Sequence, residues 1–353
     1  MITDESTELR KYLFNRIDVK DSKEVRDLYS FLDNIQLKPL HIEHYHVKHK
    51  HSLEIEPSDF IPDNIIKKTY IMNRTTIHFT VGKLKVKLFI HSKEDSKKFI
   101  NIIVSVIQYV CSLSIIDINE LSINYYLLKN KKEINKNTKE FTKNEINSGY
   151  CKDGPFKTEI TIYRIEEVVK VTIHELFHAL HYDYRNDPLH IINHYKNKYN
   201  ITSTKLKSYE AYTEIWANII NIYLISKKSK RSPYNIFITL LALEKEFCEF
   251  QSHKVFYVTN LGDKPTDINK KTGIFPYFIL RCELYQRLNL FIKHCRLHNI
   301  DYVKIDKEEK WFNLLKKNTT IKKNNRRFNK FNENSIIYKT MRMSINEIKV
   351  TDE

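Results

Sequence analysis

The stretch VVKVTIHELFHALHYD, residues 168–183, indicates both a fold and a chemistry. His174 and His178 are four residues apart, so on a helix their side chains project from one face. Imidazole nitrogens at this spacing can bind one zinc ion at about 2.0–2.1 Å. Glu175 lies about 100° round the helix from His174, where it can take a proton from a zinc-bound water. The stretch therefore predicts a zinc centre with a general base beside it.

The rest of this helix is apolar, which predicts that it is buried. Two imidazoles and a carboxylate buried without partners would cost several kcal/mol, on the order of the transfer cost of polar groups, and a metal ion offsets that cost. The alternative interpretation is a pair of core histidines hydrogen-bonded to their neighbours, because HExxH patterns also occur by chance. The apolar positions are Val169, Val171, Ile173, Leu176, Phe177 and Leu180.

A catalytic zinc needs a third protein ligand, with water in the fourth position. The metzincin pattern requires a glycine and a third histidine just after the motif, but this chain has His181 and Tyr184 there. The later segment YEAYTEIWANIINIYL, residues 209–224, carries Glu210 and Glu214 on one face of an otherwise apolar helix. One carboxylate can bind the metal, and the other can accept the free N–H of a ligand histidine.

HELFH and the later EAYTE together resemble the gluzincin metallopeptidases, whose pattern is HExxH followed by ExxxD/E. The resemblance implies His174, His178 and Glu210 as ligands of one Zn²⁺ per chain. It also implies Glu175 as the general base and Glu214 as the support of a ligand histidine. The activity that it implies is that of a zinc metalloendopeptidase acting on a polypeptide substrate.

The resemblance covers residues 166–217 and leaves two roles open. The supporting acid is a glutamate where an aspartate is commoner, so Glu210 and Glu214 can exchange roles. Gluzincins also stabilise the oxyanion with a tyrosine or histidine from a nearby element. The candidates here are Tyr209, Tyr212, Tyr277 and His253, of which we select Tyr209 and Tyr277.

A longer run, NSGYC at 147–151 followed by TEITIYRIEEVVKVTIHELFH at 158–178, is similar to uncharacterised metallopeptidase-like proteins of large DNA viruses. That similarity implies the host-cell cytoplasm or the virion as the location. A cytoplasmic location is also expected because the first twenty residues lack the apolar core of a signal peptide. The five cysteines are widely spaced and form no CxxC pair, which favours a reducing compartment. Polar residues interrupt the apolar stretch 99–116, so it predicts a buried helix and no membrane span.

The hydrophobic pattern predicts an α+β, zincin-like fold, with strands in the first half and helices in the second. We expect an N-terminal α/β region at 1–90, a zincin N-terminal subdomain at 91–182 and a helical C-terminal subdomain at 183–353. A polar loop is expected at 129–146. The expected strands are 41–56, a hairpin over 75–91 that turns at Gly82–Lys83, 120–128 and 158–164. The expected helices are 6–37, 95–113, 166–182, 206–228, 233–251, 275–298 and 306–317.

An extended peptide substrate would add to an edge strand of the sheet. The sequence offers 121–129 or 158–164 for that edge, with the turn between them at 147–149. The strand expected at 41–56 carries five histidines, which could bind a metal: His41, His44, His46, His49 and His51. We interpret them as side chains of exposed strand faces, because no carboxylate or cysteine completes a site.

The chain has a formal net charge of +16, and two alternative functions follow from it. One is a basic nucleic-acid-binding protein with a structural zinc, and the other is a non-catalytic zinc-containing interaction protein. The basic residues are spread along the chain, which favours compositional bias over a nucleic-acid site. A basic stretch near the C-terminus, with Phe328 and Phe331 interleaved, is interpreted as a solvated segment: Lys316, Lys317, Lys322, Lys323, Arg326, Arg327 and Lys330.

Overall fold

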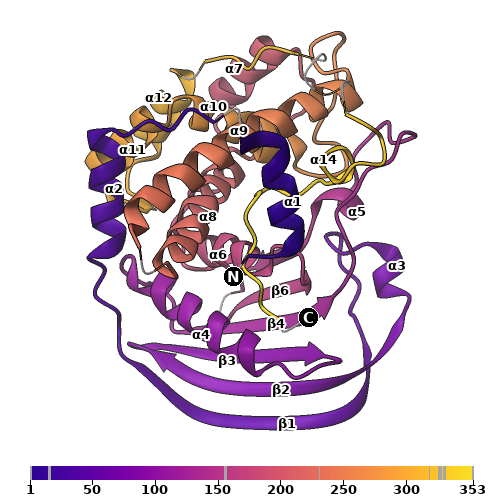
Figure 1. Ribbon diagram of the computed structural model, residues 1–353, viewed down its shortest axis with the longest axis vertical. Coiled ribbons are helices and arrows are strands. Elements are labelled where there is room, and N and C mark those ends of the chain that lie inside the picture. The colour runs from indigo at the N-terminus through magenta and orange to yellow at the C-terminus, as the bar shows by residue number, and fades with distance from the viewer. Residues whose placement is uncertain are drawn as a thin grey trace. The chain divides into compact units, whose positions relative to one another are not determined.

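The computed structural model divides the chain into two compact units (Figure 1). We call Ile35–Lys131, Asn147–Tyr182 and Ile348–Glu353 the sheet unit, and the remainder, Met1–Asn34, Lys132–Ile146 and Asp183–Glu347, the helical unit. Both units are built from separate segments of the chain, while the boundaries expected at residues 90 and 182 stay predictions. The structure describes residues 2–14, 17–154, 157–229, 231–317, 319–324, 328 and 331–351.

The described residues of the sheet unit form a mixed six-stranded sheet and three helices. The strand order is β1-β2-β3-β4-β6-β5, in which β3, β4 and β6 run parallel and the other neighbours run antiparallel. The strands are β1 (Leu40–Glu54), β2 (Thr69–Val81), β3 (Leu84–Ser92), β4 (Glu120–Leu128), β5 (Gly149–Lys152) and β6 (Thr158–Arg164). The helices are α3 (Asp63–Ile66), α4 (Lys97–Ser112) and α6 (Val168–Ala179).

The predicted hairpin is confirmed, and its turn explains the register of β2 and β3. Gly82 has φ +60°, a conformation that glycine adopts without steric cost, and Val81 pairs with Leu84 across the turn. Buried and exposed residues alternate along β3, as expected for a strand with one face in the core. The aromatic ring of Phe99 on α4 packs edge-on against Tyr125 of β4, with centroids 5.1 Å apart.

Helix α6 is anchored to the sheet and to α4 by two hydrogen-bonding tyrosines. The hydroxyls of Tyr125 on β4 and Thr172 on α6 lie 2.8 Å apart, and the Tyr182 hydroxyl donates to the carbonyl of Val110 on α4. Gly149 of β5 allows a close approach as well, because an added Cβ would lie only 2.9 Å from the Thr161 carbonyl oxygen. These contacts fix the position of the helix that carries the HExxH motif.

The C-terminal end of α6 is a Schellman motif. The amide of His181 donates to the carbonyl of His178, and the amide of Tyr182 donates to that of Phe177. His181 takes the left-handed conformation, with φ +54°, that this motif requires. The helix therefore ends at Ala179, three residues before the expected end, and the His181 side chain is exposed.

The expectation about the sheet edge is wrong. Both expected edge strands, 121–129 and 158–164, are internal, because β4 lies between β3 and β6 and β6 lies between β4 and β5. The edges of this sheet are β1 and the four-residue β5, which begins at Gly149, where a turn was expected. A strand of four residues is too short to show an alternating pattern, so the sequence did not indicate it.

The helical unit confirms the predicted helical character of the second half of the chain. Its helices are α1 (Asp4–Leu13), α2 (Lys23–Asp33), α5 (Lys143–Ile146), α7 (Leu189–Tyr199), α8 (Ser208–Lys227), α9 (Pro233–Thr259), the π-helix η2 (Phe275–Leu280), α10 (Arg281–Gln286), α11 (Leu288–His298), α12 (Glu308–Lys316) and α14 (Ile336–Lys339). A short hairpin joins β7 (Asn299–Ile300) to β8 (Lys304–Ile305). Among the described residues, no helix has the length and apolarity needed to cross a bilayer.

Three expectations for these helices are corrected. The single helix expected over 275–298 is the π-helix η2 followed by α10 and α11. The single helix expected over 6–37 is two helices, because Ser22 caps a new one by accepting a hydrogen bond from the amide of Val25. Helix α7 was not expected. Its buried Ile191, Tyr195 and Tyr199 recur every four residues, which is the spacing of one helix face, so the pattern was present in the sequence but was not recognised.

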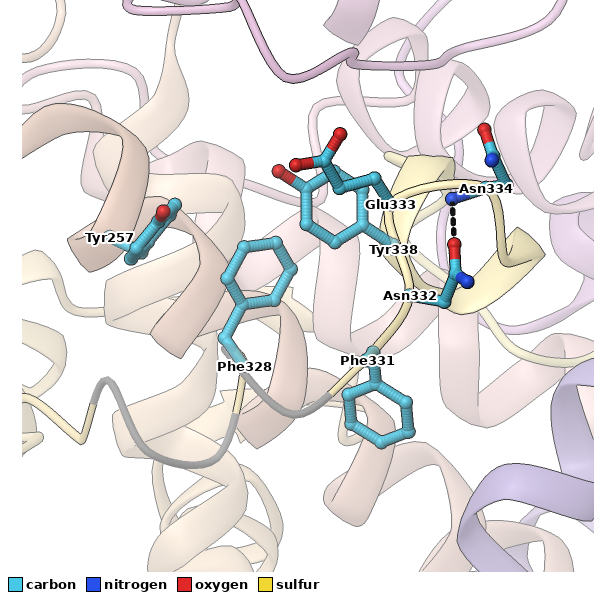
Figure 2. Close-up of a pocket in the computed structure, with 7 residues that line it drawn as sticks. All are labelled: Tyr257, Phe328, Phe331, Asn332, Glu333, Asn334 and Tyr338. Carbon is cyan, nitrogen blue, oxygen red and sulfur yellow. Dashed lines mark hydrogen bonds between the residues drawn. The ribbon is translucent and has the colours of Figure 1, made fainter.

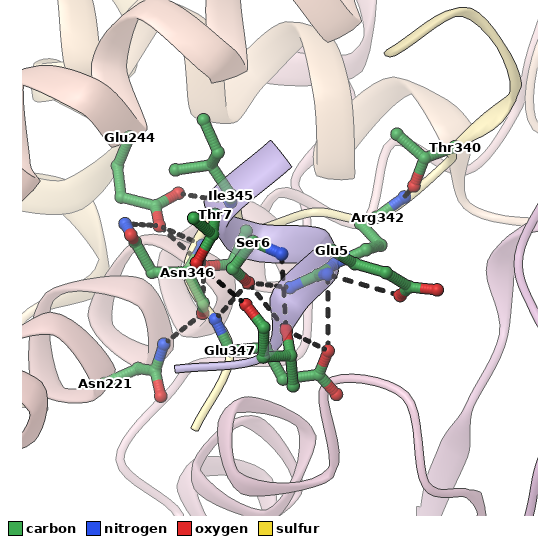
Figure 3. A network of polar contacts seen from close by, with 12 residues as sticks. Glu5, Ser6, Thr7, Asn221, Glu244, Thr340, Arg342, Ile345, Asn346 and Glu347 are labelled. Carbon is green, nitrogen blue, oxygen red and sulfur yellow. Dashed lines mark hydrogen bonds and ion pairs between the residues drawn. The ribbon is translucent and has the colours of Figure 1, made fainter. Parts of the chain in front are cut away.

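A buried polar network holds residues 340–347 in the helical unit (Figure 3). The fully buried carboxylate of Glu244 on α9 accepts hydrogen bonds from the Ser344 hydroxyl and from the backbone and side-chain amides of Asn346. Asn221 of α8 donates to the Asn346 carbonyl, and Arg342 pairs with Glu347 at 3.2 Å. This segment therefore fixes α8, the helix with Glu210 and Glu214, against α9.

We predict that Glu244→Ala lowers the free energy of unfolding by about 3 kcal/mol or more, because several buried donors lose their acceptor. Urea denaturation followed by circular dichroism measures the change. Glu309→Ala, at an exposed position in the first turn of α12, is the control and should change it by less than about 1 kcal/mol. Equal effects of the two substitutions would contradict the assigned role of the network.

Candidate metal centre

Helix α6 buries the two histidines and the glutamate of the motif. His174 is 5% exposed, and Glu175 and His178 are each 6% exposed. All the other residues of the helix are buried as well. The four-residue spacing puts the two imidazoles on one face, as predicted. Their ring centroids lie 4.8 Å apart and their Nε2 atoms 3.1 Å apart. The two Nε2 atoms are within hydrogen-bonding distance of each other, and they are also close enough to bind one ion.

This geometry fits a shared zinc ion. Two nitrogens bound tetrahedrally at about 2.0–2.1 Å would lie roughly 3.3 Å from each other, close to the distance between the Nε2 atoms of His174 and His178. The chemistry fits as well, because neutral imidazole is a good ligand for zinc and the surrounding apolar residues exclude water. Glu175 is the next residue after His174 on the same buried helix, so its side chain is about 100° round the helix axis.

Glu210 lies in the helical unit, in the first turn of α8. Its carboxylate is partly exposed and accepts a hydrogen bond of 2.9 Å from the hydroxyl of Tyr277. Asp187 anchors the start of the same helix, because its carboxylate accepts hydrogen bonds from the amide and hydroxyl of Ser208. Burial raises the pKa of Asp187, and these hydrogen bonds oppose the rise. The position of Glu210 is thus fixed from two sides.

Glu214 lies one turn further along α8 and is in a different environment. It is 1% exposed, and the guanidinium of Arg281 lies 3.1 Å from its carboxylate. Arg281 is itself fully buried and also donates to the carbonyl of Met343. Glu214 is therefore a carboxylate within a buried ion pair, whereas Glu210 is a partly exposed carboxylate with a neutral donor. Of the two, Glu210 has the environment that suits a metal ligand.

The partners of the two glutamates come from one continuous helical segment. Tyr277 lies in the π-helix η2, and Arg281 begins α10 four residues later. A π-helical turn changes the direction of the side chains that follow it, and such turns recur at functional sites. Here it brings Tyr277 and Arg281 to two successive turns of α8. Sequence analysis missed Arg281, although an arginine in the apolar run FPYFILRCELY is the kind of signal that could have found it.

The two oxyanion candidates lie in the helical unit, near Glu210. The hydroxyl of Tyr277 donates to Glu210, and its proposed role toward an oxyanion stays a prediction. Tyr209 precedes Glu210, and burial, together with the charges of Glu210 and Asp187, raises its pKa, so this phenol stays protonated. His181, on the exposed turn after α6, lies 4.0 Å from Asp153 and belongs to the helix end.

The aromatic residues of the basic C-terminal stretch contribute to a hollow in the helical unit (Figure 2). Phe328 is fully buried and stacks on Tyr338 at 4.7 Å, and the ring of Phe331 contacts Phe250 at 5.2 Å. The cavity of about 530 Å³ contains none of the predicted site residues. Its lining residues are Tyr257, Phe328, Phe331, Asn332, Glu333, Asn334 and Tyr338. The expected basic residues Arg326, Arg327 and Lys330 lie outside the described residues.

Comparison with known proteins identifies no relative. No protein-family model, no curated protein and no solved structure matches this chain.

We predict that Arg281→Met lowers the free energy of unfolding by about 3–5 kcal/mol, because the buried Glu214 carboxylate loses its guanidinium partner. Combining it with Glu214→Gln should recover part of the loss, since the uncompensated charge is removed. Chemical denaturation of the single and double variants measures this coupling.

Lys227→Met is the matched control, because Lys227 forms an exposed ion pair with Asp33 and should contribute less than about 1 kcal/mol. If the effects of the two single substitutions, at Glu214 and at Arg281, add up to the effect of the double substitution, the ion pair is not the interaction that stabilises this part of α8.

Proposed function

We propose that this chain is a zinc-dependent peptidase whose zinc is bound by His174, His178 and Glu210. The observation that carries the proposal is the pair of buried imidazoles on α6, with Nε2 atoms 3.1 Å apart. Among the described residues, these two histidines and Glu210 are a group that could hold a metal ion. Two neutral imidazoles and one carboxylate are the ligand set of many catalytic zinc sites.

The environments of the two acids support Glu210 as the third ligand. The Tyr277 hydroxyl donates to a carboxylate oxygen of Glu210, which restricts the rotation of this carboxylate. Glu214 is buried beside Arg281, and binding a metal there would compete with a guanidinium. We propose that Glu214 supports the site from this ion pair.

Each residue has a role in peptide hydrolysis under this proposal. Bound zinc supplies a Lewis acid that lowers the pKa of water and polarises a carbonyl. Glu175 takes the proton from the attacking water and returns it to the leaving amine. The buried position of Glu175 keeps competing water away and places its carboxylate next to a ligand histidine. A Tyr277 or Tyr209 hydroxyl would stabilise the oxyanion.

The zincin-like arrangement is also a proposal, supported by the order of elements along the chain. A mixed sheet precedes the HExxH helix, and a helical region with the third ligand follows it. An extended substrate would pair with an edge strand of the sheet, and we propose β5 for this function. It is next to β6 in the sheet and its N-terminal residue, Gly149, packs near Val171 of α6.

We predict that tag-free protein dialysed against metal-free buffer retains about one zinc per chain, as expected of a site with three protein ligands. His178→Ala should lose it, and Glu210→Gln should weaken binding much more than Glu214→Gln. Elemental analysis by mass spectrometry measures the content. Wild-type protein without zinc would refute the metal centre. If Glu214→Gln lost more zinc than Glu210→Gln, the third ligand would be Glu214 and the supporting acid Glu210.

We predict that Glu175→Gln keeps zinc but lowers the rate of peptide hydrolysis by about 10²-fold or more, because the proton acceptor is lost. Cleavage of an unfolded protein such as reduced casein, with and without a chelator, is the measurement. Glu159→Gln, on β6 of the same unit, is the control and should cleave as the wild type does. Zinc binding without cleavage by the wild type would favour a non-catalytic zinc protein.

A further inference from the structure

Three histidines lie on one face of the neighbouring strands β1 and β2. Strand β1 lies beside β2 at one edge of the sheet (Figure 1). The register of the two strands places His44 directly opposite His78. Their ring centroids are 5.3 Å apart. His46 follows two residues after His44, so its side chain lies on the same face of the strand. The centroids of the His44 and His46 rings are 6.3 Å apart.

These separations are close to those of imidazoles that share a metal ion. At a metal–nitrogen distance of about 2.0–2.1 Å, two rings on one ion have centroids roughly 5–6 Å apart, depending on the angle at the metal. The cross-strand pair, His44 and His78, is already within that range. The ring of His46 has to turn about its side-chain torsions to come within that range. For comparison, the buried pair on α6 has a centroid separation of 4.8 Å.

The side chains of His44, His46 and His78 can change rotamer to make this adjustment. His44 and His46 are exposed and His78 is partly exposed. Among the described residues, no hydrogen bond or ion pair holds any of these three imidazoles. Metal binding therefore breaks no buried contact and costs only the ordering of surface rotamers. The backbone ladder between β1 and β2 already fixes the three Cα positions.

We propose that His44, His46 and His78 form a surface site for a divalent transition-metal ion of the zinc, copper and nickel class. The donor set consists of imidazole nitrogens, which these ions prefer, whereas calcium and magnesium prefer oxygen ligands. Three protein ligands leave at least one position to water, so the ion is exchangeable. This site is independent of the centre proposed on α6.

The local charge is compatible with a bound cation. Lys87 of β3 lies opposite His78 on the other side of β2, and its ammonium lies 3.9 Å from the carboxylate of Glu120. The lysine is exposed and flexible, so its repulsion is screened by solvent and partly offset by this glutamate. Lys48, two residues after His46 on the same face, pairs with Arg74 of β2, so these two cations also oppose a bound metal, and solvent screens part of the repulsion.

A bound ion would stabilise the pairing of the edge strand β1 with β2. Most side chains of β1 are exposed, and its pairing with β2 is irregular between Ile42 and His44 and between Lys48 and His51. The proposed ligands lie on the regular stretch between these irregularities. One ion that binds residues of both strands would hold this stretch of β1 on β2. Ligand binding to the paired state would slow the opening of the strand.

The test is a zinc titration of tag-free, full-length protein that has been stripped of metal with a chelator. Binding is followed by calorimetry, and the number of zinc equivalents is the readout. The wild type should bind two. The variant His44→Ala/His78→Ala should bind one, while the matched control His41→Ala/His49→Ala, with two exposed histidines removed from the same strand, should bind two. Circular dichroism checks that each variant is folded.

The two proposed sites fail separately in this experiment. If His44→Ala/His78→Ala binds as many equivalents as the wild type, the surface site is refuted and the centre on α6 is untouched. If His174→Ala/His178→Ala still binds one equivalent of zinc, and the added substitutions His44→Ala/His78→Ala remove it, the surface site is supported. Amide hydrogen exchange at residues 44–47 gives a second readout, since the second equivalent should slow it in the wild type and leave it unchanged in His44→Ala/His78→Ala.

Discussion

The burial of charge on apolar helices is the constraint on which the rest of the structure depends. Every residue of α6 is buried, and an imidazole pair and a carboxylate are among them. Glu214 and Arg281 are buried on helices of the other unit in the same way. Groups of this kind remain stable in a core only when partners compensate for the lost water. In the helical unit the compensation is an ion pair, and on α6 the proposed compensation is a metal ion.

The same constraint distinguishes the two glutamates of α8, which the sequence presents as equivalent. They are one turn apart on one face, and each meets a different side chain from the segment that starts as a π-helix. The neutral phenol of Tyr277 contacts Glu210, and the charged guanidinium of Arg281 contacts Glu214, so the two carboxylates are in different environments although they are one helical turn apart. The assignment of roles therefore depends on the side chains that surround α8 more than on the motif itself.

Local patterns predicted the elements well, and long-range pairing explains the rest. The HExxH helix and the β2–β3 hairpin follow from periodicity and from one glycine turn, so the sequence was sufficient. The partner of His44 could not be predicted, because His78 is brought opposite it only by the register of two strands. Arg281 was missed because a π-helical turn shifts the face on which it lies. The sheet edge was assigned wrongly because β5 has only four residues.

The network around residues 340–347 has a consequence for folding kinetics. Ser6 of the first helix accepts a hydrogen bond from the amide of Glu347, 341 residues later in the sequence. Arg10 of that helix donates a hydrogen bond to the side-chain oxygen of Asn346. Contacts between such distant positions require the closure of a very long loop, and folding rates fall as the average sequence separation of contacts rises. On a ribosome, α1 emerges long before its binding partner exists, so the helical unit can complete its packing only after nearly the whole chain has been synthesised.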